Sequence, residues 1–311
     1  MTASSTRPGP APHAPRTTPA HAVTLIPGAP APCAASYGRL TGLLPALRVY
    51  CAPPRSGDGW VSGADLLARP EALRELIAHD ARQGLARYGR PLRPDVAAGF
   101  GLHRFVWPVS VLATLPWFLE RRVPLLTPGD VSVRRGTGEL TVRPEAFLCL
   151  PDDPAAGLRG ARTVPDGPAL AAGLRAALAD LLTPVLAAFR PQVRRGPRTL
   201  WAMATDAVVE GLWYVGRLLG EEERARAELS ALLTPELPAC APGAGRSGTG
   251  APAPFTPGAG FTSGARPGPD APNAQDTQDA RTADRTRASC CLVYTVRPEA
   301  MCGGCPRVAR G

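Results

Sequence analysis

Four cysteines near the C-terminal end of this 311-residue chain form the strongest chemical pattern in the sequence. Cys290 and Cys291 are adjacent, ten residues separate them from Cys302, and two glycines separate Cys302 from Cys305. Four thiolates match the ligand count of a [2Fe-2S] cluster, two for each iron. The glycines permit close approach of backbone N–H groups to sulfur. The spacing therefore favours a [2Fe-2S] cluster held by these four cysteines, with no catalytic residue expected beyond the cluster.

A structural zinc site is the main alternative, because four cysteines also suit zinc. Zinc sites usually take their ligands from two short chelating loops, and two adjacent cysteines make a poor loop of this type. Adjacent side chains of a regular strand face opposite ways, so Cys290 and Cys291 can share a site only if the backbone bends there. Residues 292–296 have strand character and Arg297–Ala300 is typical of a turn, so we expect a hairpin that brings Cys291 beside Cys302.

The tail resembles that of the FhuF-type ferric siderophore reductases, a family marked by this Cys-Cys, ten-residue gap and Cys-x-x-Cys arrangement. The flanking residues also match, namely Arg287, Ser289, Leu292, Tyr294 and the final Cys305–Pro306. A looser similarity covers roughly residues 60–306, including Arg198–Trp201 and the apolar segment 100–119. The resemblance implies a [2Fe-2S] oxidoreductase of iron homeostasis that reduces Fe(III)-siderophore and releases Fe(II). It implies Cys290, Cys291, Cys302 and Cys305 as the ligands.

Other functions stay open at this point, namely a zinc-stabilised binding module, a ferredoxin-like electron carrier or an iron–sulfur sensor. The sequence Gly99-Phe100-Gly101 lacks the third glycine and the preceding strand of a dinucleotide-binding fingerprint, and no P-loop occurs. We therefore expect electrons to come from a separate donor, such as a ferredoxin or a flavin reductase.

Composition limits the partners and the location of the protein. The net charge is +9 and all 35 basic residues are arginines, but they are spread along the chain without a block of like charges, so we expect no nucleic-acid partner. The first thirty residues lack a continuous apolar segment of the signal-peptide type. The most apolar stretch, 105–119, is shorter than the roughly 20 residues of a membrane span and contains Pro108 and Pro116. We expect no transmembrane segment and a cytoplasmic location.

Low-complexity composition divides the chain into four parts. Residues 1–35 and the Pro/Gly-rich stretch 238–287 contain few large apolar side chains and are predicted to be a disordered tail and a disordered tether. A helical body is expected over 36–237, and the cluster-binding segment over 288–311. Cys33 and Cys240 would then lie in the tail and the tether, whereas Cys51 and Cys149 are expected in or near the core.

The body that must position this segment is predicted to be α+β and mainly helical, with a small antiparallel β-hairpin or sheet. Apolar spacing predicts helices over 64–89, over a segment capped by Asp95, and over Pro168–Phe189, Arg198–Leu219 and 221–233. Two β-prone runs, Val131–Val133 and Leu140–Val142, flank a glycine-containing turn and predict the hairpin. Single residues of interest receive plain structural interpretations: His79 and His103 as surface or core-edge residues, the tryptophans as core, and Asp206 with Glu210 as a solvated helix edge.

Overall fold

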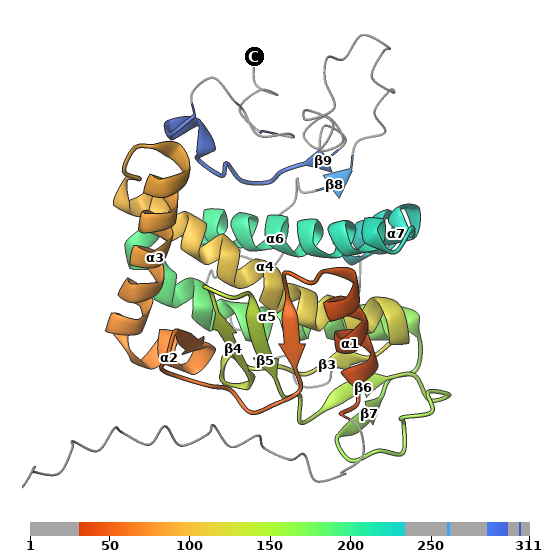
Figure 1. Cartoon of the computed structure of the whole chain (residues 1–311). Coiled ribbons are helices and arrows are strands. Elements are labelled where there is room, and N and C mark those ends of the chain that lie inside the picture. Colours follow the sequence, from red (N-terminus) through yellow and green to blue (C-terminus); the bar gives the residue numbers. More distant parts are fainter. Residues whose placement is uncertain (1–30, 234–259, 262–284, 298–304, 306–311) are drawn as a thin grey trace, which may run out of the picture. The chain divides into compact units, whose positions relative to one another are not determined.

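The computed structural model describes residues 31–233, 260–261, 285–297 and 305 (Figure 1). In this part of the chain the α-helices are α1 Ala34–Leu43, α2 Gly63–Ala68, α3 Pro70–Tyr88, α4 Pro94–Glu120, α5 Gly167–Val193, α6 Pro197–Leu218 and α7 Glu222–Leu233. The strands are β1 Arg48–Tyr50, β2 Trp60–Ser62, β3 Val123–Pro124, β4 Val131–Arg134, β5 Glu139–Val142, β6 Phe147–Cys149, β7 Ala161–Thr163, β8 Gly260–Phe261 and β9 Arg285–Thr286. Short 3₁₀ helices are η1 Pro128–Asp130 and η3 Val293–Thr295.

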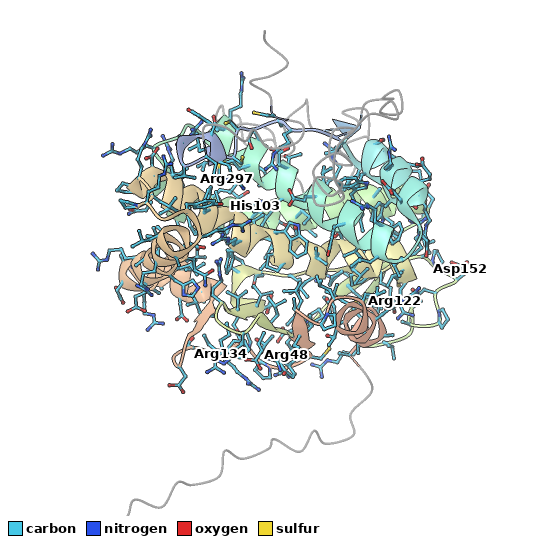
Figure 2. All side chains as sticks on the ribbon, turned by 45° about the horizontal axis from the view of Figure 1, so that its top comes forward. Arg48, His103, Arg122, Arg134, Asp152 and Arg297 are labelled. Carbon is cyan, nitrogen blue, oxygen red and sulfur yellow. The ribbon has the colours of Figure 1, made fainter. Side chains whose placement is uncertain are left out.

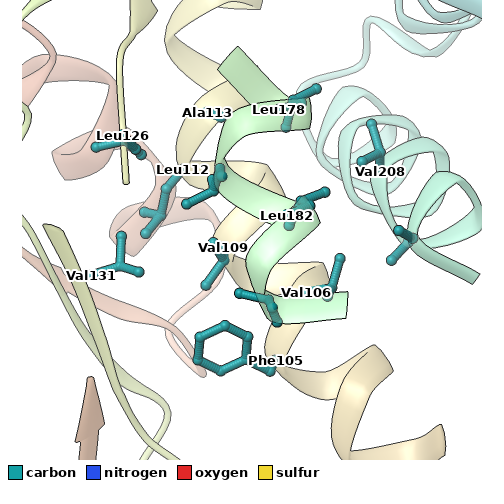
Figure 3. Close-up of a cluster of buried hydrophobic side chains, with 14 of the residues drawn as sticks. Phe105, Val106, Val109, Leu112, Ala113, Leu126, Val131, Leu178, Leu182 and Val208 are labelled. Carbon is teal, nitrogen blue, oxygen red and sulfur yellow. The ribbon is translucent and has the colours of Figure 1, made fainter. Parts of the chain in front are cut away.

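The long helix α4 forms the centre of the core. It is apolar around most of its circumference, which is typical of a helix buried on all sides, and it packs against α3, α5 and α6. Figure 3 shows Phe105, Val109 and Leu112 of α4 beside Leu182 of α5, with Val131 of β4 closing the other side. Burial of these side chains is the main source of the body's stability.

Two small sheets cover one side of these helices. Strands follow the order β1-β5-β4-β2 in the first sheet and β3-β6-β7 in the second. The β4–β5 hairpin pairs Val131 with Val142 in antiparallel register, whereas β1 joins β5 in parallel. Gly138 makes the hairpin turn possible, because its φ is +68° and a Cβ there would lie 1.9 Å from the carbonyl oxygen of Ala46.

The predicted fold class is confirmed, since the described chain is mainly helical with small mixed sheets. The hairpin and the helices α5, α6 and α7 lie close to their predicted positions, but Pro70 divides the helix predicted over 64–89 into α2 and α3. Asp95 is not the helix cap, because α4 begins at Pro94 and Asp95 instead accepts two hydrogen bonds from Arg93.

The ordered body begins earlier than predicted. Cys33 was expected in a disordered tail, but its side chain is fully buried and helix α1 follows directly at Ala34. The reason is tertiary packing, since Tyr37 of the same helix is buried and donates a hydrogen bond to the Leu112 carbonyl of α4. Burial raises the pKa of Cys33 to about 12, and the nearby Glu120 carboxylate adds to this effect. Residues 1–30 lie outside the described part of the chain.

Helices α4 and α5 are long and apolar enough to cross a membrane, with mean hydropathies of 1.3 and 1.5 over their most apolar windows. These windows are 78% and 50% buried inside the protein. A core helix of a soluble protein meets the same criterion, and the packing of α4 against three other helices accounts for its composition.

Candidate functional site

The chain around the first cysteine pair lies across helices α6 and α4. This stretch begins with β9, which pairs with β8, continues through Cys290 and Cys291, and ends after η3 at Arg297 near α3 (Figure 1). Residues 287–297 are called the docked segment below. Figure 2 shows Arg297 of this segment on the same side of the body as His103 of α4.

A buried carboxylate on α6 holds the start of the docked segment. Asp206 Oδ1 accepts a hydrogen bond of 2.9 Å from the Ala288 N–H. Its Oδ2 accepts bonds of 2.9 Å from the Ser289 N–H and 2.6 Å from the Ser289 hydroxyl. Asp206 is 0% exposed and Ser289 is 4% exposed, so these bonds to a charged acceptor are shielded from water. The carboxylate therefore fixes the backbone immediately before Cys290.

The expectation that Asp206 and Glu210 form a solvated helix edge was wrong for Asp206. The helix places it on the covered face, where it takes part in tertiary contacts with a segment more than eighty residues away in sequence. Arg287 completes the contact, because its Nη1 lies 3.5 Å from Glu210 Oε2 and its Nε lies 3.9 Å from Asp206 Oδ2. His103 Nε2 is 3.8 Å from the other oxygen of Glu210, which links the contact to α4.

An apolar patch holds the far end of the docked segment. Leu292 and Val296 are buried against Leu92, which precedes α4, and against Val96 and Ala97 in its first turn. The strand expected for residues 292–296 is wrong: Val293–Thr295 form η3, which carries Leu292 and Val296, at its two ends, onto the same patch. Leu292 adopts a left-handed conformation with φ of +64°, so the backbone bends directly after Cys291.

The cysteines predicted as ligands are only partly within the described residues. Cys290 is half-buried beside the apolar patch, Cys291 is half-buried and lines a cavity, and Cys305 is 6% exposed. Cys302 lies outside the described part, as do residues 298–300 of the expected turn. Among the described residues, no three His, Cys, Asp or Glu side chains are grouped closely enough to hold one metal ion. The thiol donors themselves fit a [2Fe-2S] cluster, which takes Cys ligands. Cys290 and Cys291 are not part of a strand, so the alternation of a strand does not apply to them.

The remaining cysteines lie away from this segment or outside the described chain. Cys149 is buried and Cys51 is half-buried, as predicted, and Cys33 is in the core as described above. Cys240 belongs to the residues that are not described. None of the described three belongs to the apolar cluster that contains Leu292 and Val296.

Residues of the docked segment and of the body together line a cavity of about 210 Å³. Tyr88, Phe100 and Met203 give it apolar walls, Arg104 and Arg287 bring two guanidinium groups, and Cys291 brings a thiol. The sequence offered no direct signal for this cavity, because its lining comes from α3, α4, α6 and the docked segment.

A buried ionic network around Asp80 positions the side chain of Arg104. Asp80 of α3 is 0% exposed and pairs with Arg104 and with Arg135, whose Nη2 lies 2.6 Å from Asp80 Oδ1. Burial lowers the pKa of Arg135 from its ordinary value, and the Asp80 charge opposes this shift. Burial also lowers the pKa of the neighbouring His79, and the charge of Arg135 acts in the same direction. Asp80 thus holds the guanidinium groups of Arg104 and Arg135 in place.

Comparison with known families gives a match at the C-terminal end of the chain. Residues 287–307 match the FhuF 2Fe-2S C-terminal domain. No curated protein matches the chain. The residues that carry the sequence resemblance have clear structural roles: Arg287 and Ser289 bind α6, Leu292 and Tyr294 pack against the apolar patch, and Cys305 is buried. The match supports a [2Fe-2S] cluster over zinc, because residues 287–307 are similar to a domain that binds such a cluster.

Proposed function

We propose that this protein is a ferric siderophore reductase. The observation that carries the proposal is the match of residues 287–307 to the FhuF 2Fe-2S C-terminal domain, on a segment held against a folded helical body. A [2Fe-2S] cluster supplies a one-electron couple, which takes one electron from a donor and reduces the Fe(III) of a siderophore complex to Fe(II).

The four ligands in this proposal are Cys290, Cys291, Cys302 and Cys305. Their number equals the ligand count of the cluster, and the matched range contains all four. The body contributes by holding the first pair: Asp206 fixes the backbone before Cys290, and Leu292 anchors the backbone after Cys291. In this arrangement the two thiols keep a defined position relative to the cavity.

The energetics of the reaction are feasible for this kind of cluster. Siderophores bind ferric iron far more tightly than ferrous iron, and each tenfold preference lowers the iron potential by about 59 mV for one electron. A preference of ten orders of magnitude would therefore lower it by about 600 mV, and biological clusters reach about −700 mV. Trapping of the released Fe(II) would draw the reaction further forward.

Location and electron supply are also part of the proposal. A cytoplasmic location fits the burial of α4 and α5 in the core and the chemistry of a thiolate-bound cluster. A separate protein, such as a ferredoxin or a flavin reductase, would supply the electron.

The test is a single-turnover experiment with anaerobically purified protein. The cluster is reduced, excess reductant is removed, and a ferric siderophore is added together with a ferrous chelator. We expect the visible absorption of the oxidised cluster to return as about one Fe(II) per cluster is trapped, because each cluster carries one electron. The variant Cys51→Ser should give the same result as the wild-type protein, since Cys51 is a half-buried cysteine outside the matched range.

Two results would separate the alternatives. Reoxidation by simple ferric salts but by no ferric siderophore would identify a general electron carrier and refute the proposal. Reoxidation by siderophore complexes with equal trapping of Fe(II) would support it.

A further inference from the structure

We propose that the cavity beside Cys291 receives one anionic chelating arm of the ferric siderophore. The inference rests on the proposed function and adds the place and the chemical class of recognition. It commits to an arm that presents iron-bound oxygen atoms, as hydroxamate, catecholate and carboxylate groups do.

The position of the cavity is the first argument. Its wall contains Cys291 of the docked segment together with side chains of α3, α4 and α6. A group inside it touches the body and a proposed cluster ligand at once. The iron carried by that group would then lie close to the cluster, and its reduction from Fe(III) to Fe(II) would need one electron and no new bond between protein and iron.

The volume of the cavity sets the size of the ligand. A complete small-molecule site usually encloses about 300–1,000 Å³. The cavity here measures about 210 Å³, so it can accept one bidentate arm while the rest of the complex stays outside. The cavity would therefore select for the chemistry of the arm more strongly than for the scaffold of the siderophore.

The chemistry of the walls is the third argument. The side chain of Arg104 is 30% exposed, and its Nη1 forms an ion pair with Asp80 that positions the guanidinium. A guanidinium carries five N–H donors in all. Arg287 is held in a similar way by Glu210. Two guanidinium groups suit oxygen atoms that carry negative charge. Phe100 and Met203 offer apolar surface to the carbon part of the arm.

The test reduces the volume of the cavity by substitutions in its helical wall. Met203→Trp enlarges a half-buried side chain in the wall. Leu218→Trp is the matched control, because it places the same side chain at an exposed position of α6 outside the cavity. Gly99→Ala is a milder change, because its new Cβ would lie 3.4 Å from Met203 Cε, an ordinary contact, and alanine favours the helix. The measurement is the rate at which the pre-reduced protein is reoxidised by a ferric trihydroxamate, a ferric tricatecholate and hexaammineruthenium(III), a compact cation without a chelating arm.

We expect Met203→Trp to slow reoxidation by the ferric chelates by about tenfold or more, and Gly99→Ala to slow it by about two- to threefold. Leu218→Trp should behave as the wild-type protein, and all variants should react with the ruthenium complex at the wild-type rate. Unchanged chelate rates in Met203→Trp and Gly99→Ala would overturn the inference. Loss of the visible bands in both variants would also overturn it, because the cavity would then belong to the cluster itself. A wild-type protein that reacts only with the ruthenium complex would instead refute the proposed function.

Discussion

Replacement of Asp206 by asparagine should release the docked segment from α6. The carboxylate accepts three hydrogen bonds, at 2.9, 2.9 and 2.6 Å, from Ala288 and Ser289. The serine hydroxyl can turn to accept from an amide NH₂, but one backbone N–H must then face another donor. The substitution also removes the negative charge that faces Arg287 at 3.9 Å.

The size of the effect follows from these contacts. A hydrogen bond to a charged acceptor contributes about 1.5–3 kcal/mol, and a buried N–H without an acceptor costs about 1–3 kcal/mol. We therefore expect Asp206→Asn to weaken docking by about 3 kcal/mol, which corresponds to about a 150-fold increase in the population of the detached segment.

Amide hydrogen exchange measures this population directly. In a peptide that spans residues 287–297, the protected amides of Ala288 and Ser289 should exchange about 150-fold faster in Asp206→Asn than in the wild type. Asp180→Asn removes the same charge from an exposed position on α5 and is the matched control. A double-mutant cycle with Ser289→Ala should give a coupling free energy of about 1–2 kcal/mol. Exchange rates within about threefold of the wild type would refute this account of the anchor, because they leave less than about 1 kcal/mol for all three bonds.

Four further predictions concern the cluster, the tether and the body. Cys305→Ser should abolish the visible absorption bands and Cys51→Ser should leave them unchanged, as absorption spectra of anaerobically purified variants would show. Deletion of about twenty residues within 243–280 should leave the cluster bands intact, whereas loss of soluble protein would make this segment structural. Asp80→Asn should lower the free energy of unfolding in urea by about 3–5 kcal/mol, because two arginines would share a buried neutral partner. Burial opposes ionisation of Asp153, but hydrogen bonds from Arg122 and the Ala155 N–H outweigh it and hold the pKa of Asp153 below its usual value. The ionised carboxylate therefore stabilises the folded state above about pH 4, and this stabilisation is lost as the pH falls through the pKa of the folded state. The difference in Tm between wild type and Asp153→Asn should accordingly shrink below about pH 4.

Local sequence patterns were sufficient for most of the body. The β4–β5 hairpin followed from two β-prone runs around a glycine turn, and α5 and α6 followed from apolar spacing, because these signals are contained within the elements themselves. The assignment of the four cysteines as cluster ligands rests on their count and spacing and stays a prediction. The error at the N-terminus arose because Cys33 and Tyr37 are buried by contacts with distant elements.

The docking of the cluster segment could not be predicted in the same way. Residues 292–296 have strand propensity, but burial of Leu292 and Val296 against α4 favours a 3₁₀ turn, so tertiary packing overrides the local preference. Asp206 was assigned to a solvated edge because aspartates are rarely buried without a partner, and its partners lie beyond residue 286. One signal was present: Asp206 is a single charge between apolar neighbours on the helix segment Trp201–Val209, where a solvated face would carry several.

The two-point attachment of the docked segment has a consequence for how such proteins can diverge. Asp206 binds the backbone just before the cysteine pair, and the apolar patch holds the residues just after it. These flanking contacts therefore set the position of the pair. Apart from β8, which pairs with β9, the length of chain between α7 and β9 then enters only through loop closure, which changes by about 0.6 kcal/mol for each doubling of length. Insertions and deletions on either side of β8 are therefore nearly neutral for the cysteine pair, whereas substitutions of Asp206, Arg287 or Ser289 alter the contacts that hold it.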